Sequence, residues 1–189
     1  MNNIIKVVEE FSLQEIEKNG SPLLDHFLIA NAEGQRLAQQ VSGDGDVVLL
    51  GTMLMDCKLG ECIREGKLKE HVQRSSQAGK KLLEEYNVDQ ETIRKVLNCI
   101  EAHHKDVPFT CKEAEIVANA DCYRFLTPRG IFAYIKMLEK RYASLDEALH
   151  QVELKMDEKW NILSLPLCKK ELEKNYKMFK QLIKEARSQ

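Results

Sequence analysis

The stretch that decides the fold is VVLLGTMLMDCKLGEC, residues 47–62. Its first half is almost entirely apolar, with no polar stripe to divide it. This pattern predicts a helix over residues 47–57 that is buried on every side. Asp56 follows directly on the apolar run, either as a helix end that meets solvent or as part of a polar site. Whether Asp56 belongs to a polar site depends on which other polar residues the chain could bring near it.

The segments around this run have helical periodicity. Residues 27–41 place small and apolar side chains on one face, which predicts a helix suited to close packing. Further helices are expected over residues 71–87, 89–104, 111–126, 131–159 and 166–187, with loops at 42–46, 59–69 and 163–166. Asp89 is expected to cap the helix that follows it. Because no segment alternates apolar and polar residues convincingly, the sequence predicts an all-α fold.

Length and composition fit one globular domain. The chain has 189 residues, of which 43% are hydrophobic and 31% are charged. We expect a single domain over 1–189, with its core at about 20–135 and a C-terminal helical extension at about 136–189. The net charge of −2 gives no general attraction to nucleic acid or to anionic membranes. No membrane span or signal peptide is expected, and the predicted compartment is cytoplasmic.

The cysteines do not form a metal-binding or disulfide pattern. There are six in the chain, and none belongs to a C-x-x-C pair: Cys57, Cys62, Cys99, Cys111, Cys122 and Cys168. A cytoplasmic location argues against disulfides. Most of them are therefore expected to be small buried core residues.

Histidines and aspartates gather at the ends of the predicted helices. The residues in question are His26, Asp56, His71, His103, His104 and Asp121. Helix ends that bring imidazoles and carboxylates together are a common way for a helical bundle to build a metal pocket. These side chains suit Zn, Mn or Fe, and with more oxygen ligands Mg. Their spacing alone does not decide between a metal site and a scatter of polar residues.

The order of five segments carries a family resemblance. They are HFLIANAEGQRLA, LLGTMLMDCK, HVQRSSQAGKKLL, IEAHH and EAEIVANAD, within residues 20–135 or so. Together they resemble the HD-domain superfamily of metal-dependent phosphohydrolases. The resemblance implies an all-helical core around a metal site with the pattern H…HD…D, in which a His-Asp doublet ends an apolar helix.

The resemblance implies metal ligands in this chain, and at one position the chain differs from the family pattern. His26 matches the first histidine, Asp56 the aspartate of the doublet and Asp121 the final aspartate. Met55 stands where the doublet should have its histidine. A thioether is a soft, weak ligand for Mn, Mg or Fe, so the implied site keeps three of four primary ligands. Cys57 lies next to the doublet, but adjacent helical residues point in different directions, which makes it a poor substitute.

The resemblance also implies residues for the chemistry. Asp56, His71 and His103 are the expected catalytic residues, and His104 is an alternative to His103. The two intervening histidines would hold a second metal or contact the substrate phosphate. Asp56 or Asp121 would orient or deprotonate a water activated by the ion.

Two basic residues, near the doublet and near the final aspartate, are candidate phosphate ligands. Lys58 is out of register with the lysine that some HD enzymes use. Arg124 lies one helical turn beyond Asp121, where it would either pair with that aspartate or meet a phosphate.

Two functional readings follow from the resemblance. The first is a metal-dependent phosphohydrolase for a small phosphoester or nucleotide, with an altered site for Mn, Fe, Zn, Ni or Mg that holds its ion weakly or not at all. The alternative is a catalytically inactive HD domain that binds a phosphorylated ligand or serves as a protein-interaction scaffold. No nucleic-acid polymer is an expected partner. Trp160, Tyr176 and Phe179 are expected to pack back onto the core, with a homodimer contact as the alternative.

Overall fold

The computed structural model of the chain describes residues 2–139 and 141–188. Within these ranges the regular structure is helical throughout and contains no strand, which confirms the all-α prediction. The helices are α1 (Asn2–Asn19), α2 (Leu24–Gln40), α3 (Gly45–Leu54), α4 (Leu59–Arg64), the 3₁₀ turn Leu68–Glu70, α5 (His71–Glu85), α6 (Gln90–Ala102), α7 (Lys112–Leu126), α8 (Pro128–Leu138), α9 (Leu145–Ile162) and α10 (Pro166–Ala186).

Two sequence predictions about the helices were wrong. Residues 59–69, expected to be a loop, contain α4 and the 3₁₀ turn. Residues 131–159, expected to be one helix, belong to α8 and α9. A local signal in the sequence marks where the second of these helices begins. Ser144 caps α9, and its side chain accepts a hydrogen bond from the Glu147 amide at 3.2 Å.

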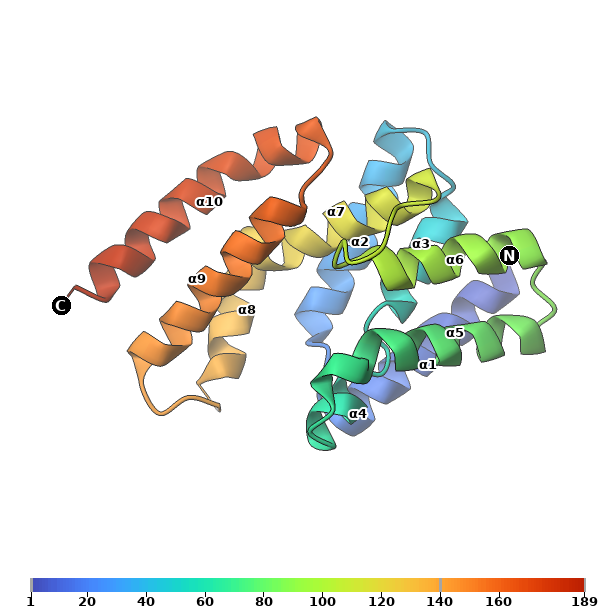
Figure 1. Cartoon of the computed structure of the whole chain (residues 1–189), viewed down its shortest axis with the longest axis horizontal. Coiled ribbons are helices and arrows are strands. Elements are labelled where there is room, and N and C mark those ends of the chain that lie inside the picture. The colour runs from blue at the N-terminus through green and yellow to red at the C-terminus, as the bar shows by residue number, and fades with distance from the viewer. Residues whose placement is uncertain (1, 140, 189) are drawn as a thin grey trace.

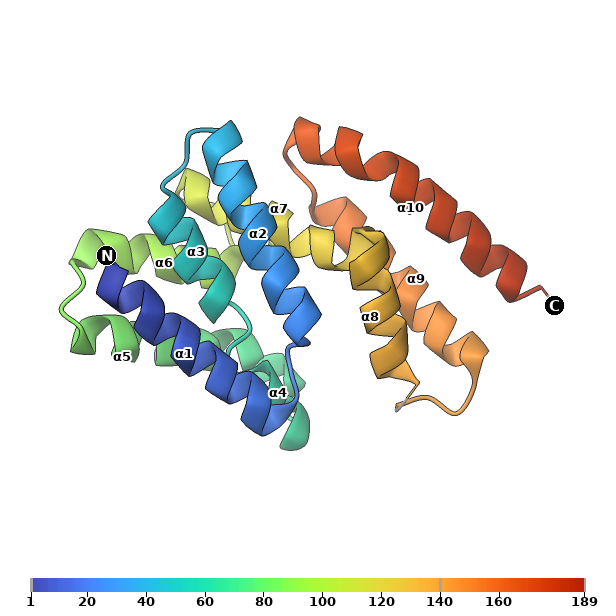
Figure 2. The same cartoon turned by 180° about the vertical axis from the view of Figure 1, so that it is seen from behind.

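The buried helix α3 lies at the centre of the N-terminal part. It packs against α1, α2, α6 and α7, as Figures 1 and 2 show from opposite sides. Gly51 allows the closest approach, because a Cβ atom at this position would lie 2.6 Å from Cys99 Cβ on α6. The all-apolar sequence of α3 is therefore explained by neighbours on every side.

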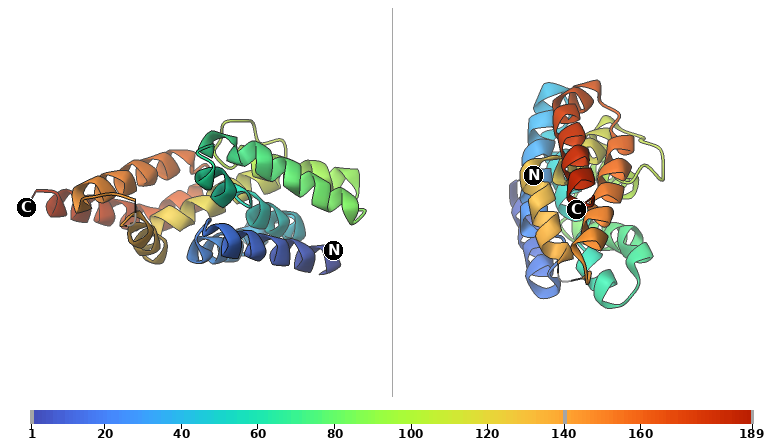
Figure 3. Two further views of the ribbon diagram at one scale, coloured as in Figure 1. Left: turned by 90° about the horizontal axis from the view of Figure 1, so that it is seen from below. Right: turned by 90° about the vertical axis from the view of Figure 1, so that its left-hand side faces the viewer.

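The C-terminal helices α8, α9 and α10 form the other part of the molecule. Figure 3 shows an elongated shape in which the two ends of the chain lie far apart. α7 connects the two parts, since it packs against α2, α3 and α6 as well as α8, α9 and α10. The Trp160 and Tyr176 rings stack with their centroids 4.5 Å apart, and Phe179 is buried. These aromatic residues pack within the chain, as the sequence predicted.

The sequence predicts no membrane span, and the helices of the structure can be compared with this prediction. Among the described residues, none of the helices combines the length and the apolar character that crossing a bilayer requires.

Replacing Gly51 with alanine tests the close packing of α3. The new methyl group would meet Cys99 Cβ, which cannot move without its backbone, so we expect a loss of about 1–3 kcal/mol in the free energy of unfolding. This should exceed the gain of about 1 kcal/mol in helix propensity. Urea denaturation measures the difference. Gly45→Ala, in the first turn of α3 with no contact closer than 3.5 Å, is the control and should change stability little.

Candidate metal centre

The end of α3 delivers Asp56 into the interior. The helix closes with a turn in which the Leu59 amide donates to the Asp56 carbonyl oxygen at 2.9 Å. The Asp56 side chain is buried and faces α7 on one side and a group of histidines on the other. Of the two interpretations of the sequence, the structure therefore supports a polar site and not a helix end in solvent.

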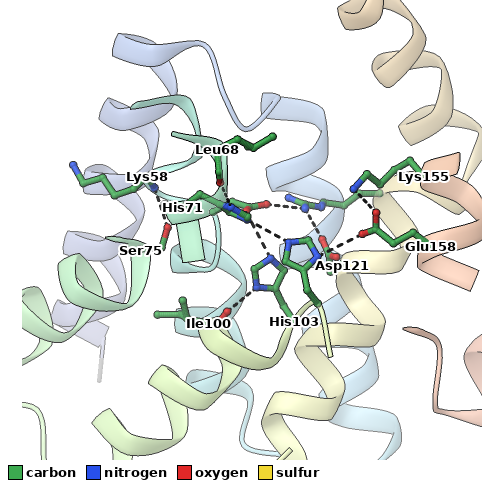
Figure 4. A network of polar contacts seen from close by, with 12 residues as sticks. Lys58, Leu68, His71, Ser75, Ile100, His103, Asp121, Lys155 and Glu158 are labelled. Atoms are coloured by element: carbon green, nitrogen blue, oxygen red, sulfur yellow. Dashed lines mark hydrogen bonds and ion pairs between the residues drawn. The ribbon is translucent and has the colours of Figure 1, made fainter. Parts of the chain in front are cut away.

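Three histidines gather beside this carboxylate. Nitrogen atoms of His71, His103 and His104 all lie within 4.8 Å of one another. His71 opens α5, while His103 and His104 follow the last residue of α6. Figure 4 shows His71 and His103 pointing toward a common centre. The structure thus brings together His103 and its sequence alternative His104.

Backbone carbonyl groups set the tautomers of two of these rings. His71 Nδ1 lies 2.7 Å from the Leu68 carbonyl oxygen, and His103 Nδ1 lies 2.6 Å from that of Ile100. A carbonyl oxygen only accepts, so each Nδ1 carries the proton and donates it. In the neutral rings, Nε2 is then left with a lone pair that faces the centre. This arrangement, with the outer nitrogen held by an acceptor, is typical of metal-binding histidines.

The third ring is held by α9. Lys159 Nζ lies 3.2 Å from His104 Nδ1, and Glu158 Oε1 lies 3.5 Å from the same atom. Nδ1 therefore accepts from Lys159 in one tautomer and donates to Glu158 in the other, and only the second tautomer leaves a lone pair on Nε2. His104 Nε2 lies 3.3 Å from His71 Nε2. The ring therefore faces the centre through Nε2 while α9 holds its opposite side.

The distances from Asp56 to two of the histidines are close to those within a coordination shell. Asp56 Oδ1 lies 3.6 Å from His71 Nε2 and 3.7 Å from His103 Nε2. Ligand atoms at the corners of a tetrahedron with bonds of about 2.1 Å are roughly 3.4 Å apart. Since the carboxylate oxygen and the two imidazole lone pairs are all acceptors, a cation between them would relieve their repulsion.

His103 provides a second observation that favours an ion. Its side chain is fully buried, and Nε2 has no hydrogen-bond partner among the described residues. Burial lowers the pKa of His103 to about 3, so the ring stays neutral at pH 7. A buried lone pair without a donor costs free energy, which an ion at this place would offset.

The opposite side of Asp56 contacts two buried cations and a second carboxylate. Arg124 Nη2 donates to Asp56 Oδ2 at 2.7 Å and lies 2.5 Å from Asp121 Oδ1. Lys159 Nζ forms an ion pair with Asp121 Oδ2 at 2.6 Å. Burial by itself would raise the pKa of both carboxyl groups. The charge of Arg124, joined at Asp121 by that of Lys159, outweighs burial and holds each pKa well below its usual range.

The remaining residues of the expected metal set lie near this ion cluster without joining it. His26 Nε2 lies 2.9 Å from the Gly130 carbonyl oxygen, so that nitrogen carries a proton and donates it. Burial is the main cause that lowers the pKa of His26 to about 4. Met55 is 1% exposed and belongs to the hydrophobic core. The ligand roles assigned to His26, Asp56 and Asp121 stay predictions.

Two neighbours of the doublet point elsewhere. The Cys57 thiol lies 4.0 Å from the Ser75 carbonyl oxygen, and burial raises its pKa to about 12. Lys58 forms ion pairs with Glu15 at 3.0 Å and with Glu61 at 3.2 Å. Neither side chain therefore faces the histidines, which agrees with the sequence prediction that Cys57 is a poor ligand and Lys58 is out of register.

A pocket of about 210 Å³ opens beside the centre. His71, His104, Asp56 and Arg124 line its inner part, and an apolar wall includes Phe125, Tyr134 and Met137. Its other polar residues are mainly basic, namely Arg141, Lys155 and Lys159. The composition suits an anionic ligand with an apolar portion.

The residues that α9 contributes to the site were not predicted from the sequence. Lys155, Glu158 and Lys159 lie in the charged C-terminal helices, outside the predicted core. A signal was present, because Lys159 continues the apolar stripe of α9 three residues after Met156 and three before Ile162. A lysine on a buried stripe indicates a buried acidic partner.

Comparisons with protein-family models, with curated proteins and with solved structures gave no match to this chain. The resemblance to the HD-domain superfamily therefore stays a prediction.

The buried histidines predict acid sensitivity. Below pH 6.5 the unfolded chain binds a proton at His26, whereas the folded protein does so only near pH 4. His103 behaves in the same way with a folded pKa of about 3. The free energy of unfolding should therefore fall as pH drops from 6.5 to 5, by up to about 1.4 kcal/mol per pH unit for each histidine.

Urea denaturation at several pH values in the presence of a chelator measures this slope. His26→Gln should reduce it, whereas His150→Gln, at an exposed position of α9, should leave it unchanged. A flat profile between pH 6.5 and 5 would show that the buried histidines accept protons in the folded protein.

Proposed function

We propose that this protein is a metal-dependent phosphohydrolase for small phosphoesters, with one divalent ion held by His71, His103, His104 and Asp56. The observation that carries the proposal is the clustering of His71, His103 and His104, whose nitrogen atoms lie within 4.8 Å of one another, with His103 Nε2 buried and without a partner. Asp56 Oδ1 lies 3.6 Å from His71 Nε2 and 3.7 Å from His103 Nε2. The order of site residues along the chain, which resembles that of the HD-domain superfamily, supports the same reaction class.

The donor set narrows the choice of ion. Three imidazole nitrogens and one carboxylate oxygen suit Zn, Mn, Fe or Ni. Mg prefers oxygen ligands and a shell rich in water, so it fits this set poorly. When bound, such an ion lowers the pKa of a water and polarises a phosphoryl oxygen.

The residues of the chain provide the anion-binding part of the reaction. Arg141 and Lys155 both line the pocket, and Lys155 also pairs with Glu158 at 2.6 Å. Their charges would bind the phosphate and offset the negative charge that develops on its oxygens. Phe125, Tyr134 and Met137 would cover the organic part of the ester and exclude water from that side.

Arg124 and Lys159 would stabilise the carboxylates of the site and would not bind the phosphate. Both are paired with buried carboxylates, and they keep Asp56 and Asp121 ionised at neutral pH. An ionised Asp56 presents Oδ1 as a ligand while Oδ2 stays fixed on the guanidinium. With an ion bound, His104 would carry its proton on Nδ1 and direct it to Glu158, which lies 3.5 Å away.

The second candidate function is binding of a phosphorylated ligand without hydrolysis. Met55 and the Arg124 pairing favour it, because they remove one ligand and occupy two others of the expected metal set. The pocket and its basic residues serve this function equally well. Hydrolysis separates the two candidates, whereas ligand binding does not.

Metal content tests the proposed ion site. The untagged protein, reconstituted with Zn or Mn and then dialysed, should retain about one ion per chain by mass spectrometry. His103→Asn should lose affinity by more than the roughly 10–100-fold typical of changing an outer-shell partner. His150→Asn, at an exposed position, is the matched control and should bind as the wild type does.

A phosphoester panel with the retained metal tests the reaction. Release of inorganic phosphate from p-nitrophenyl phosphate or nucleoside monophosphates should require the ion and disappear in His103→Asn. Retained metal and ligand binding without any phosphate release would establish the second candidate. A wild-type protein that retains no ion under any of these conditions would refute the metal-dependent proposal.

A further inference from the structure

The Asp56 carboxylate faces two positions for positive charge. Oδ1 is directed to His71 and His103, at 3.6 and 3.7 Å. Oδ2 is directed to Arg124, at 2.7 Å. The two positions therefore lie side by side and share one carboxylate, as two metal ions in a binuclear site would.

The position on the Oδ2 side is filled by the chain itself. A single nitrogen of Arg124, Nη2, contacts both Asp56 Oδ2 and Asp121 Oδ1, at 2.7 and 2.5 Å. Two carboxylates from different helices thus converge on one cationic nitrogen. The guanidinium is 4% exposed, and Asp121 is fully buried. Arg124 Nη2 therefore contacts the same two carboxylates that an ion bridging Asp56 and Asp121 would contact.

The Oδ2 side has no room for an additional cation. Arg124 Nη2 already lies between Asp56 Oδ2 and Asp121 Oδ1, and Lys159 Nζ lies 2.6 Å from Asp121 Oδ2. A divalent ion bridging the two carboxylates would have to displace the guanidinium and would leave that buried charge without a partner.

The other candidate ligands at this position also fail to fit an ion. Met55 offers a thioether that is packed in the core. His26 Nε2 donates its proton to the Gly130 carbonyl oxygen, so it has no lone pair available. The set His26, Met55, Asp56 and Asp121 therefore does not suit a metal while Arg124 is present.

We propose that Arg124 is a built-in cation that replaces one of two metal ions, so that the centre takes one ion and not two. The inference rests on the proposed function only for the ion on the histidine side. Met55 is then not the sole reason why no ion binds on the Oδ2 side. A histidine at position 55 would not create a second ion site while the Arg124 guanidinium stays in place.

The experiment counts ions in four proteins that are reconstituted with Mn or Zn and dialysed. Wild type and Met55→His should bind the same number. Met55→His combined with Arg124→Met should bind one more, because the change removes the competing charge and frees both carboxylates. Met55→His combined with Arg129→Met is the control, since Arg129 is an exposed arginine paired with Asp25, and it should gain nothing.

The change in the number of bound ions from Met55→His to Met55→His/Arg124→Met does not depend on how many ions the wild type binds. A wild type without metal refutes the proposed function, while the gain of an ion on removal of Arg124 still tests this inference. An additional ion in Met55→His alone would overturn it, and so would an unchanged count in the Met55→His/Arg124→Met protein.

Thermal unfolding provides a second readout besides the ion count. Arg124→Met should be less stable than wild type in chelator, because two buried carboxylates lose a shared partner. Added Mn or Zn should raise its Tm by more than it raises that of wild type. If the metal raises both values equally, the vacated position does not accept an ion and the inference fails.

If Arg124→Met does not fold, the Met55→His variant still tests the inference, because it keeps every charge of the site in place. It should hold as many ions as wild type, and a gain of one ion would contradict the replacement of a metal by Arg124.

Discussion

Two carboxylates buried in a helical core are the constraint on which this structure depends. Asp56 and Asp121 are removed from water, and each would be very unfavourable without a fixed positive partner. Arg124 and Lys159 provide those partners at 2.5 to 2.7 Å. The pairs connect the end of α3, the C-terminal half of α7 and the end of α9. Removing any one member would leave a buried charge uncompensated, so the packing of these helices and the ion cluster depend on each other.

The histidine side of the site follows from this arrangement. Because Arg124 holds Asp56 by Oδ2, the free oxygen Oδ1 is fixed toward α5 and the end of α6. The carbonyl groups of Leu68 and Ile100 then turn two imidazole lone pairs to the same place. The fold thus collects electron-pair donors on one side of a carboxylate and cations on its other side. Such a division of charge suits a site that takes a cation and an anion together.

The sequence predicted those parts of the fold and site that rest on local pattern. The apolar run before Asp56 indicated the buried helix α3, and Asp89 indicated the start of α6, where its side chain accepts from the Thr92 amide at 2.9 Å. The order of Asp56, His71 and His103 indicated residues that the structure does bring together. Lys159 was not predicted, because its role depends on how α9 packs against α7. The pairing of Arg124 with Asp121 was one of two stated alternatives, but its contact with Asp56 crosses between helices and has no local signal.

Met55 and Arg124 explain each other in physical terms. A histidine at position 55 with no ion to bind would be a buried imidazole in need of a hydrogen-bond partner, whereas methionine fills the same core space without that need. A guanidinium between Asp56 and Asp121 provides the charge that those carboxylates require whether or not metal is available. The two carboxylates then have cationic partners from the chain itself, and their charge is offset without an ion at the histidines. The structure is therefore compatible with an ion on the histidine side that exchanges while the helices stay in place.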